Sequence, residues 1–154
     1  MTPSTEEKAA ETEAKNLELM QTLDDAWNTQ EWTTFRNRHA ATVRVSWPGG
    51  RPATVGRDAH HDESVEFFKT FPDNRVENRP YKVLFARGEW TCSIARFSGT
   101  MAGPMARPDG TTIAPTHRHF RTEFCTVAHW MNGQIVEENL FYDLIGVMQQ
   151  IGLA

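Results

Sequence analysis

The chain has 154 residues, with sixteen Lys and Arg against twenty Asp and Glu, and its formal net charge is -4. This length fits one domain, and because no basic block is present, neither nucleic acid nor an anionic membrane surface is an expected partner. No apolar run approaches the roughly 20 residues that a membrane span requires, and the first residues lack the basic and apolar regions of a secretory signal. We therefore expect a cytoplasmic protein whose partner is a small hydrophobic molecule.

The first half of the chain has the pattern of helices. Residues 1–12 are polar and are expected to form a flexible extension, so that one domain spans residues 13–154. In the first helix, apolar side chains and Asp24 fall on one stripe at spacings of three and four. His39 is expected at the end of the second helix, where a cation is favourable. The predicted helices cover about Glu13–Asn28, Trp32–His39 and Arg57–Thr70.

The second half has the period of two that is typical of strands. Asn132-Gly133 lies between two alternating runs, which is the strongest short-range signal of a hairpin. The Gly- and Pro-containing segment 102–115 is expected to be a loop. Helices followed by consecutive strands predict an α+β fold with the helices on one face of a curved antiparallel sheet. The predicted strands cover about 43–47, 76–85, 89–101, 120–130 and 134–144.

Neither cysteine is expected to take part in chemistry. Cys92 and Cys125 fall inside strand-like runs, and in a reducing compartment such residues are more often small buried hydrophobes than members of a disulfide or metal pair. The chain has no G-x-S-x-G sequence, and neither cysteine has an obvious base. A serine or cysteine nucleophile is therefore not expected.

Four stretches carry a resemblance to a known family: AWNTQEWTTF, GRDAHHDESVEFFKTFPD, WTCSIARFSGTM and NGQIVEENLFYDLIGVMQQIG. In this order and spacing, over about residues 15–152, the chain resembles the SnoaL-like polyketide (ester) cyclases of the nuclear-transport-factor-2-like superfamily. The resemblance implies a cone-shaped, curved antiparallel sheet wrapped around N-terminal helices, a deep apolar pocket, and a homodimer. It also implies ring closure by aldol condensation without a metal or an organic cofactor.

The chemistry that the resemblance implies is proton transfer. A carboxylate removes a proton next to an ester or ketone, and hydrogen-bond donors stabilise the enolate. On the family pattern, the catalytic aspartate falls on Leu140 and its histidine neighbour on Thr126. Neither side chain can exchange a proton at neutral pH, so other residues must supply this chemistry if the protein is an enzyme.

His60 and Glu63 are the first candidates for an acid and base pair. They are three residues apart on the third predicted helix and share a face, which Phe67 continues one turn later. By the family resemblance this face looks into the pocket, opposite Trp27. The alternative is a solvated first turn whose acids lie near the positive end of the helix dipole.

Glu138 and Tyr142 are the second candidates. In a strand they share a face with Leu140, which is the pocket face if the family register holds. A buried Glu138 with a raised pKa could act as a base, and the Tyr142 phenol could donate a hydrogen bond to an oxyanion. The alternative is that Glu138 pairs with an arginine such as Arg96 at a wet cavity mouth.

Aromatic side chains are expected to form the wall of the pocket and to favour a flat hydrophobic ligand. The alternative is that they form an ordinary hydrophobic core. The residues that we expect to contact the substrate are Trp27, Trp47, Phe67, Phe71, Phe124, Thr126 and Leu140.

The remaining histidines do not predict a metal site. His117 and His119 alternate along an extended segment and could bind a metal together, but no third ligand has a suitable spacing. We expect both near the exposed start of a strand, and His129 outside the cavity. The expected protein therefore contains no metal and no cofactor.

Three functions agree with the sequence. The first is acid and base catalysis without a cofactor on a hydrophobic carbonyl or ester compound, of the cyclase or isomerase type. The second is hydrolysis of an ester, lactone or epoxide by an activated water. The third is a binding module that holds a hydrophobic metabolite without chemistry.

Overall fold

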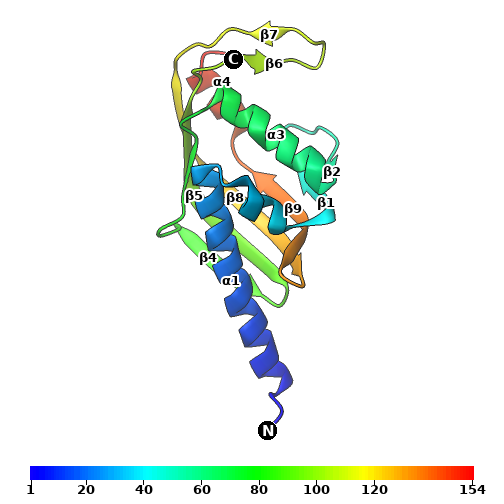
Figure 1. The fold of residues 1–154 in the computed structure, drawn as a ribbon. Coiled ribbons are helices and arrows are strands. Elements are labelled where there is room, and N and C mark those ends of the chain that lie inside the picture. The colour runs from blue at the N-terminus through cyan, green and yellow to red at the C-terminus, as the bar shows by residue number, and fades with distance from the viewer.

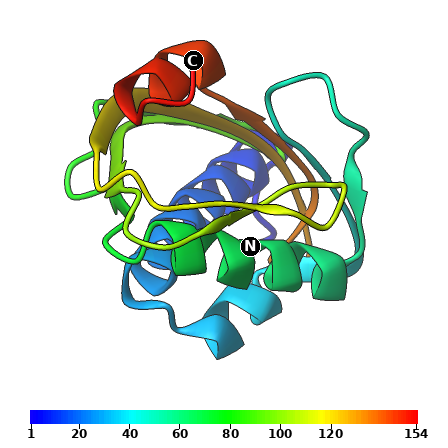
Figure 2. The ribbon, with the colours of Figure 1, turned by 90° about the horizontal axis from the view of Figure 1, so that it is seen from above.

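The computed structural model describes residues 1–154 as an α+β fold in which helices lie against one face of a curved sheet (Figure 1). Seen from above, the sheet forms a bent wall with the first helix inside its curve (Figure 2). The elements are α1 (Thr5–Thr29), α2 (Trp32–Asn37), β1 (His39–Ser46), β2 (Thr54–Val55), α3 (Arg57–Thr70), β3 (Arg75–Glu77), β4 (Val83–Arg87), β5 (Trp90–Thr100), β6 (Met105–Ala106), β7 (Thr112–Ile113), β8 (His119–Met131), β9 (Gln134–Phe141) and α4 (Leu144–Gln150).

Helix α1 begins eight residues before the predicted start at Glu13. Ser4 caps it, because the Ser4 hydroxyl accepts a hydrogen bond from the backbone of Glu7 and the Glu7 carboxylate accepts one from the backbone of Ser4. The first turns are exposed and project away from the domain (Figure 1). Local capping, rather than burial, therefore extends the helix. The mobility of residues 1–12 stays a prediction.

The prediction that His39 ends the second helix is wrong. Helix α2 ends at Asn37, and His39 is the first residue of β1 and is completely buried. His39 therefore does not lie at the charged end of a surface helix. The helix ends before His39 because that side chain bonds to the backbone carbonyl of Phe35 and to Glu138, which is 99 residues away.

The main sheet has the strand order β2-β1-β9-β8-β5-β3, and β4 pairs with β5 beyond the end of β3. Every pairing is antiparallel except that of β1 with β9, which is parallel. The expected sheet was wholly antiparallel, and the expected strand over residues 76–85 is in fact two strands, β3 and β4. The sheet is therefore mixed, although the α+β class is confirmed.

The long β5 and β8 strands pair along their length and form the centre of the wall. On β5 the predicted alternation is confirmed, because Thr91, Ser93, Ala95 and Phe97 are buried on the helix side. The cysteines lie on the outer side of the sheet and are free, and they are half-buried rather than buried as expected. Cys92 therefore takes no part in the interior.

A register shift between β8 and β9 decides which side chains face the interior. The shift lies between His129 and Trp130, and beyond it Ile135 is buried although it is three residues from Glu138. Val136, which a regular strand would place on the face of Glu138, is only half-buried. A bulge of this kind re-aims side chains in a strand, so the regular alternation that we expected holds only from Glu138 onward.

The predicted loop 102–115 contains a small hairpin of its own, formed by β6 and β7. Figures 1 and 2 show it across the end of the molecule where α3 and α4 lie. This hairpin, α3 and α4 surround the open end of the cone.

Candidate active site

The interior of the cone contains a small cavity of about 30 Å³, which is room for about one water molecule. Its wall comes from α1, α2, α3 and the concave face of the sheet. Seven residues that the sequence predicts for the site line it, and five others complete it: Trp27, Trp47, His60, Phe124, Thr126, Glu138 and Leu140, with Leu23, Asp24, Phe35, Val76 and Phe97.

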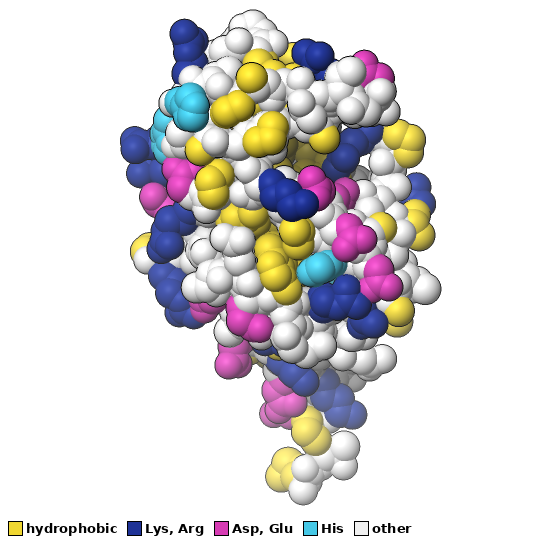
Figure 3. Space-filling view, turned by 45° about the horizontal axis from the view of Figure 1, so that its top comes forward, with side chains coloured by type: hydrophobic (Ala, Val, Ile, Leu, Met, Phe, Trp, Pro, Cys, Tyr) yellow, Lys and Arg dark blue, Asp and Glu magenta, His cyan; other side chains and the backbone are white.

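A larger groove of about 650 Å³ lies at the open end, between α3, α4 and the β6–β7 hairpin. Figure 3 shows apolar side chains in a hollow of this face with charged side chains beside it. The groove adjoins the inner cavity because Trp47 and Phe97 line both. The predicted site residues in the groove, rather than in the cavity, are Glu63, Phe67, Phe71 and Tyr142.

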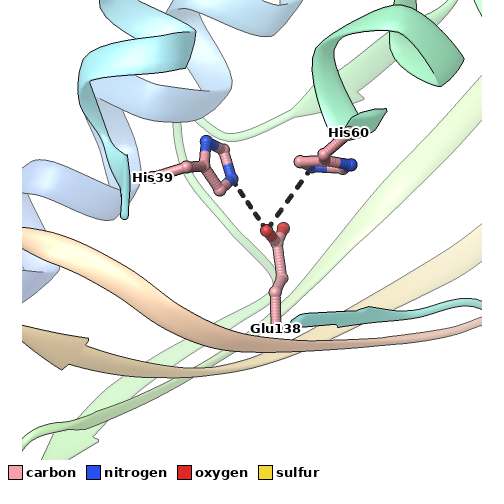
Figure 4. Close-up of side chains that lie close together, drawn as sticks. All are labelled: His39, His60 and Glu138. Carbon is pink, nitrogen blue, oxygen red and sulfur yellow. Dashed lines mark hydrogen bonds and ion pairs between the residues drawn. The ribbon is translucent and has the colours of Figure 1, made fainter. Parts of the chain in front are cut away.

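Three buried side chains from distant parts of the chain meet at the wall of the inner cavity (Figure 4). His39 on β1 lies with Nε2 2.8 Å from Oε2 of Glu138 on β9. His60 on α3 lies with Nε2 3.7 Å from the same oxygen. The Nδ1 of His39 donates a hydrogen bond of 2.7 Å to the carbonyl of Phe35. The sequence pointed to His60 and Glu138 but not to His39.

His60 and Glu63 form the pair that their spacing predicts, with Nδ1 of His60 2.8 Å from Oε1 of Glu63. Glu63 also accepts hydrogen bonds from Trp47 Nε1 at 2.7 Å, Thr54 Oγ1 at 2.7 Å and Arg51 at 3.3 Å. Burial alone would raise the pKa of the Glu63 carboxyl, but these donors together hold that pKa below its ordinary value. The alternative of a solvated first turn is therefore wrong for this pair.

The expectation that Glu138 has a raised pKa is wrong. Burial would raise the pKa, but the hydrogen bond from His39 and the charges of His39 and His60 lower it below the ordinary value for a glutamate. Glu138 does not pair with Arg96, whose nearest acid is Glu77 at 3.7 Å. Glu138 is therefore an anion held by two imidazoles and a poor proton acceptor.

The carboxyl group with a raised pKa is Asp24 on α1, which sequence reasoning did not select. Burial raises the pKa of Asp24 to about 7, against the effect of a hydrogen bond of 2.6 Å that the Tyr81 hydroxyl donates to it. Burial also raises the pKa of Tyr81. Asp24 could have been identified from the sequence, because it falls inside the apolar stripe of the first helix. Tyr81 lies outside regular structure, and no sequence pattern pointed to it.

Tyr142 lies in the groove, stacked on Phe124 with ring centroids 5.6 Å apart. Burial raises the pKa of its phenol, so the hydroxyl stays protonated and can donate a hydrogen bond. Thr126 and Leu140 are direct partners across β8 and β9, and both line the cavity. Their match to the acid and base positions of the family stays a prediction.

The other histidines lie away from the cavity wall. His119 is exposed at the start of β8 and bonds to Thr100, as expected, and His129 stacks on Trp90 on the outer side of the sheet. The side chains whose ligand atoms approach one another as metal ligands would are His39, His60 and Glu138. His117 and His119 are not among them.

A family model described as SnoaL-like polyketide cyclase matches residues 17–151. The chain belongs to this SnoaL-like polyketide cyclase family. No curated protein matches the sequence. In this SnoaL-like chain, no helix is both long and apolar enough to cross a membrane.

Solved structures share the fold of this SnoaL-like protein. A proposed SnoaL-like polyketide cyclase from Jannaschia sp. CCS1 has a TM-score of 0.80 and 21% identity, covering 100% of this chain and 99% of that one. A proposed polyketide cyclase from Xanthomonas campestris has a TM-score of 0.77 and 16% identity, covering 92% and 99%. A protein with a ketosteroid isomerase-like fold from Catenulispora acidiphila has a TM-score of 0.70 and 17% identity, covering 89% and 94%.

Proposed function

We propose that the protein is an enzyme that moves protons on a hydrophobic carbonyl or ester compound, with Asp24 as the group that takes and returns the proton. The observation that carries this proposal is a carboxyl group with a pKa of about 7 at the wall of an apolar cavity. A general base works best when its pKa lies near the working pH, and Asp24 meets this condition mainly because it is buried, with a smaller contribution from the negative charges of Glu138 and Asp25.

The shape of the interior supports a substrate that lies mainly in the groove. The groove has the larger volume and apolar walls, whereas the inner cavity has room only for the reacting end of such a molecule. Trp47 and Phe97, which line both spaces, would flank the bond between the body of the substrate and its reactive carbonyl. Asp24 would then approach, from the side of α1, the substrate carbon that loses its proton.

The other proposed site residues act as donors and supports. Glu63 holds the Nδ1 proton of His60 and leaves Nε2 on the side of Glu138 and the cavity. Glu63 and Glu138 orient the imidazoles rather than take protons, because the pKa of each carboxyl group is lowered. Tyr142, protonated in the groove, would donate to a substrate oxygen.

A hydrolytic reaction is the second candidate, and the size of the inner cavity favours it. A space for about one water molecule, bordered by Asp24 and His60, would place that water beside a base. An ester, lactone or epoxide in the groove would then be opened by the water. Both reactions need the same carboxylate, so they share the test that follows.

The test is a panel of hydrophobic ketones, esters, lactones and epoxides, incubated with the protein and followed by mass spectrometry. For the compound that is turned over, we expect Asp24→Asn to lower kcat/KM by about 100-fold or more. The matched control is Asp25→Asn, because Asp25 is the next residue on α1 and bonds to Arg79 rather than lining the cavity. This control should change kcat/KM by less than about threefold.

Two results would count against the proposal. Equal losses in Asp24→Asn and Asp25→Asn would show that Asp24 has no special role. Saturable binding of a panel compound without turnover, unchanged in Asp24→Asn, would instead support the binding module that the sequence also allows.

A further inference from the structure

The cluster of His39, His60 and Glu138 is completely formed within the fold. The three residues are 0%, 2% and 6% exposed, and one ligand atom from each lies within 4.8 Å of the others. They come from β1, α3 and β9, so the tertiary fold, and not a local sequence motif, brings them together. Two imidazoles and one carboxylate form a donor set that zinc and iron(II) sites use.

The hydrogen bonds made by Nδ1 of the two imidazoles leave the same nitrogen, Nε2, facing Glu138 on each ring. A backbone carbonyl can only accept a hydrogen bond, so Nδ1 of His39 carries a proton and donates it to Phe35. The Glu63 carboxylate likewise accepts from Nδ1 of His60. Nε2 of each ring faces Oε2 of Glu138, and Nε2 of His39 donates a hydrogen bond of 2.8 Å to that oxygen, so a bound metal ion would take the place of this proton. Metal-binding histidines are held in this manner, through a carbonyl or a carboxylate on the other ring nitrogen.

The distances also fit a metal ion between the three groups. Bonds of about 2.1 Å in a tetrahedral centre place two ligand atoms about 3.4 Å apart. The Nε2 atoms of His39 and His60 lie 2.8 Å and 3.7 Å from Oε2 of Glu138, on either side of that value. The three ligand atoms all lie within 4.8 Å of one another, so the centre would form by side-chain rotation that draws them together.

The charges match a divalent cation. Two carboxylates, Glu138 and Glu63, lie against the two imidazoles. Glu63 does not face the centre directly but bonds to His60. A divalent ion held by the two imidazoles would have Glu138 as its direct counter-charge, while Glu63, which also pairs with the half-exposed Arg51, lies behind His60.

We propose that His39 Nε2, His60 Nε2 and Glu138 Oε2 bind one divalent transition-metal ion of the zinc type, with its fourth position open to the inner cavity. His60 and Glu138 line that cavity, whose volume of about 30 Å³ suits a coordinated water. The expectation of metal-free chemistry gave no role to His39, whereas the proposed metal site uses His39 as a ligand. The proposal is separate from the function of Asp24, because it is read from metal binding and not from turnover.

The test is titration of the chelator-treated protein with Zn²⁺ followed by calorimetry, and with Co²⁺ followed by visible absorption. We expect one equivalent of each ion to bind, with the strong visible absorption that Co²⁺ shows in a four- or five-coordinate site. Glu138→Gln and His60→Asn should each weaken binding by about 100-fold or more, because each removes a ligand. The matched control is His119→Asn, since His119 is exposed and outside the cluster. It should bind as tightly as the unchanged protein.

The proposal fails if neither ion binds saturably, or if Co²⁺ binds with only the weak absorption of a hydrated six-coordinate ion. It also fails if His119→Asn weakens binding as much as Glu138→Gln does, because the ions would then occupy surface histidines. Circular dichroism of each variant shows whether it is folded. If a ligand variant unfolds, the stoichiometry and the Co²⁺ spectrum of the unchanged protein decide the question alone.

Discussion

Asp24 and Asp25 are neighbours on α1, yet their surroundings shift their pKa values in opposite directions. The hydrogen bond from Arg79 lowers the pKa of Asp25, whereas burial raises that of Asp24 to about 7. Successive residues of a helix point about 100° apart, so one carboxylate faces solvent and the other faces the cavity. The difference between the two residues therefore comes from the fold and not from their chemistry.

This environment predicts a pH-dependent effect of Asp24→Asn on stability. The pKa of Asp24 is raised from 3.8 to about 7 on folding, so the contribution of this group is complete below pH 3.8 and is lost as the pH rises through 7. At pH 8, Asp24→Asn should be more stable than the unchanged protein by about 2 to 4 kcal/mol. Urea unfolding at pH 8 and at pH 3.5 measures this difference, which should vanish at the lower pH. A variant that is less stable at both pH values would contradict the prediction.

Removal of His39 should cost more than removal of a surface histidine. His39→Ala leaves the Glu138 carboxylate buried without its nearest partner, and breaking a buried ion pair in this way costs about 3 to 5 kcal/mol. His119→Ala, at an exposed position, should change the free energy of unfolding by less than about 0.5 kcal/mol. Urea unfolding of both variants at pH 7 gives the comparison. A loss of less than 1 kcal/mol in His39→Ala would show that the pair does not hold the charge of Glu138.

At this scale, the sequence identified the local pair but not the distant one. His60 and Glu63 are three residues apart on a helix, so their contact follows from helix geometry. His39 and Glu138 are 99 residues apart, and their contact depends on the parallel pairing of β1 with β9. The sequence around His39 does not indicate that pairing, so His39 was predicted to be the last residue of a helix.

Among the elements, α3 is held at its C-terminal end by the segment that follows β5. Gly103 donates its backbone N–H to the carbonyl of Thr70, and a Cβ atom at Gly103 would lie 1.9 Å from the carbonyl oxygen of Lys69. Only glycine allows this approach of backbone to backbone. The contact connects α3, which supplies His60, to the hairpin that borders the groove.

We therefore expect Gly103→Ala to destabilise the protein by more than about 2 kcal/mol, because the backbone must move away from Lys69. Gly110→Ala is the control: the space around Gly110 is open, and only its positive φ of +84° is unfavourable, at about 1 kcal/mol. Thermal unfolding of the two variants measures the difference. Equal losses of stability in the two variants would show that the backbone can move away from Lys69 at little cost.

The elements that local signals define were predicted well. Helix α3 spans Arg57–Thr70 as predicted, because Gly56 and Phe71-Pro72 mark its ends. The bulge between β8 and β9 and the separation of β3 from β4 were not predicted. These features depend on how neighbouring strands pair, which the alternation within one strand does not record.

At the scale of the whole molecule, the outer face of the sheet remains uncovered. Phe85, Trp90 and Phe141 are exposed on it, and they come from β4, β5 and β9. We predict that two copies of the chain associate through this face, and light scattering after gel filtration should give twice the mass of the chain. Phe141→Glu should give the single mass, because a buried carboxylate would oppose the contact.

The control for association is Ile145→Glu, since Ile145 is also exposed but lies on helix α4 rather than on a strand of the sheet. It should leave the double mass unchanged. A single mass for the unchanged protein, or dissociation by Ile145→Glu alone, would contradict the predicted interface.

The most direct test of the proposed chemistry is the titration of the Asp24 carboxyl group itself. Aspartate labelled with carbon-13 at Cγ gives NMR signals whose chemical shifts follow protonation of each carboxyl group. We predict that one signal titrates near pH 7 and that this signal is absent from Asp24→Asn. Titration of every aspartate below about pH 5, near the ordinary range, would contradict the prediction and remove the base from the cavity.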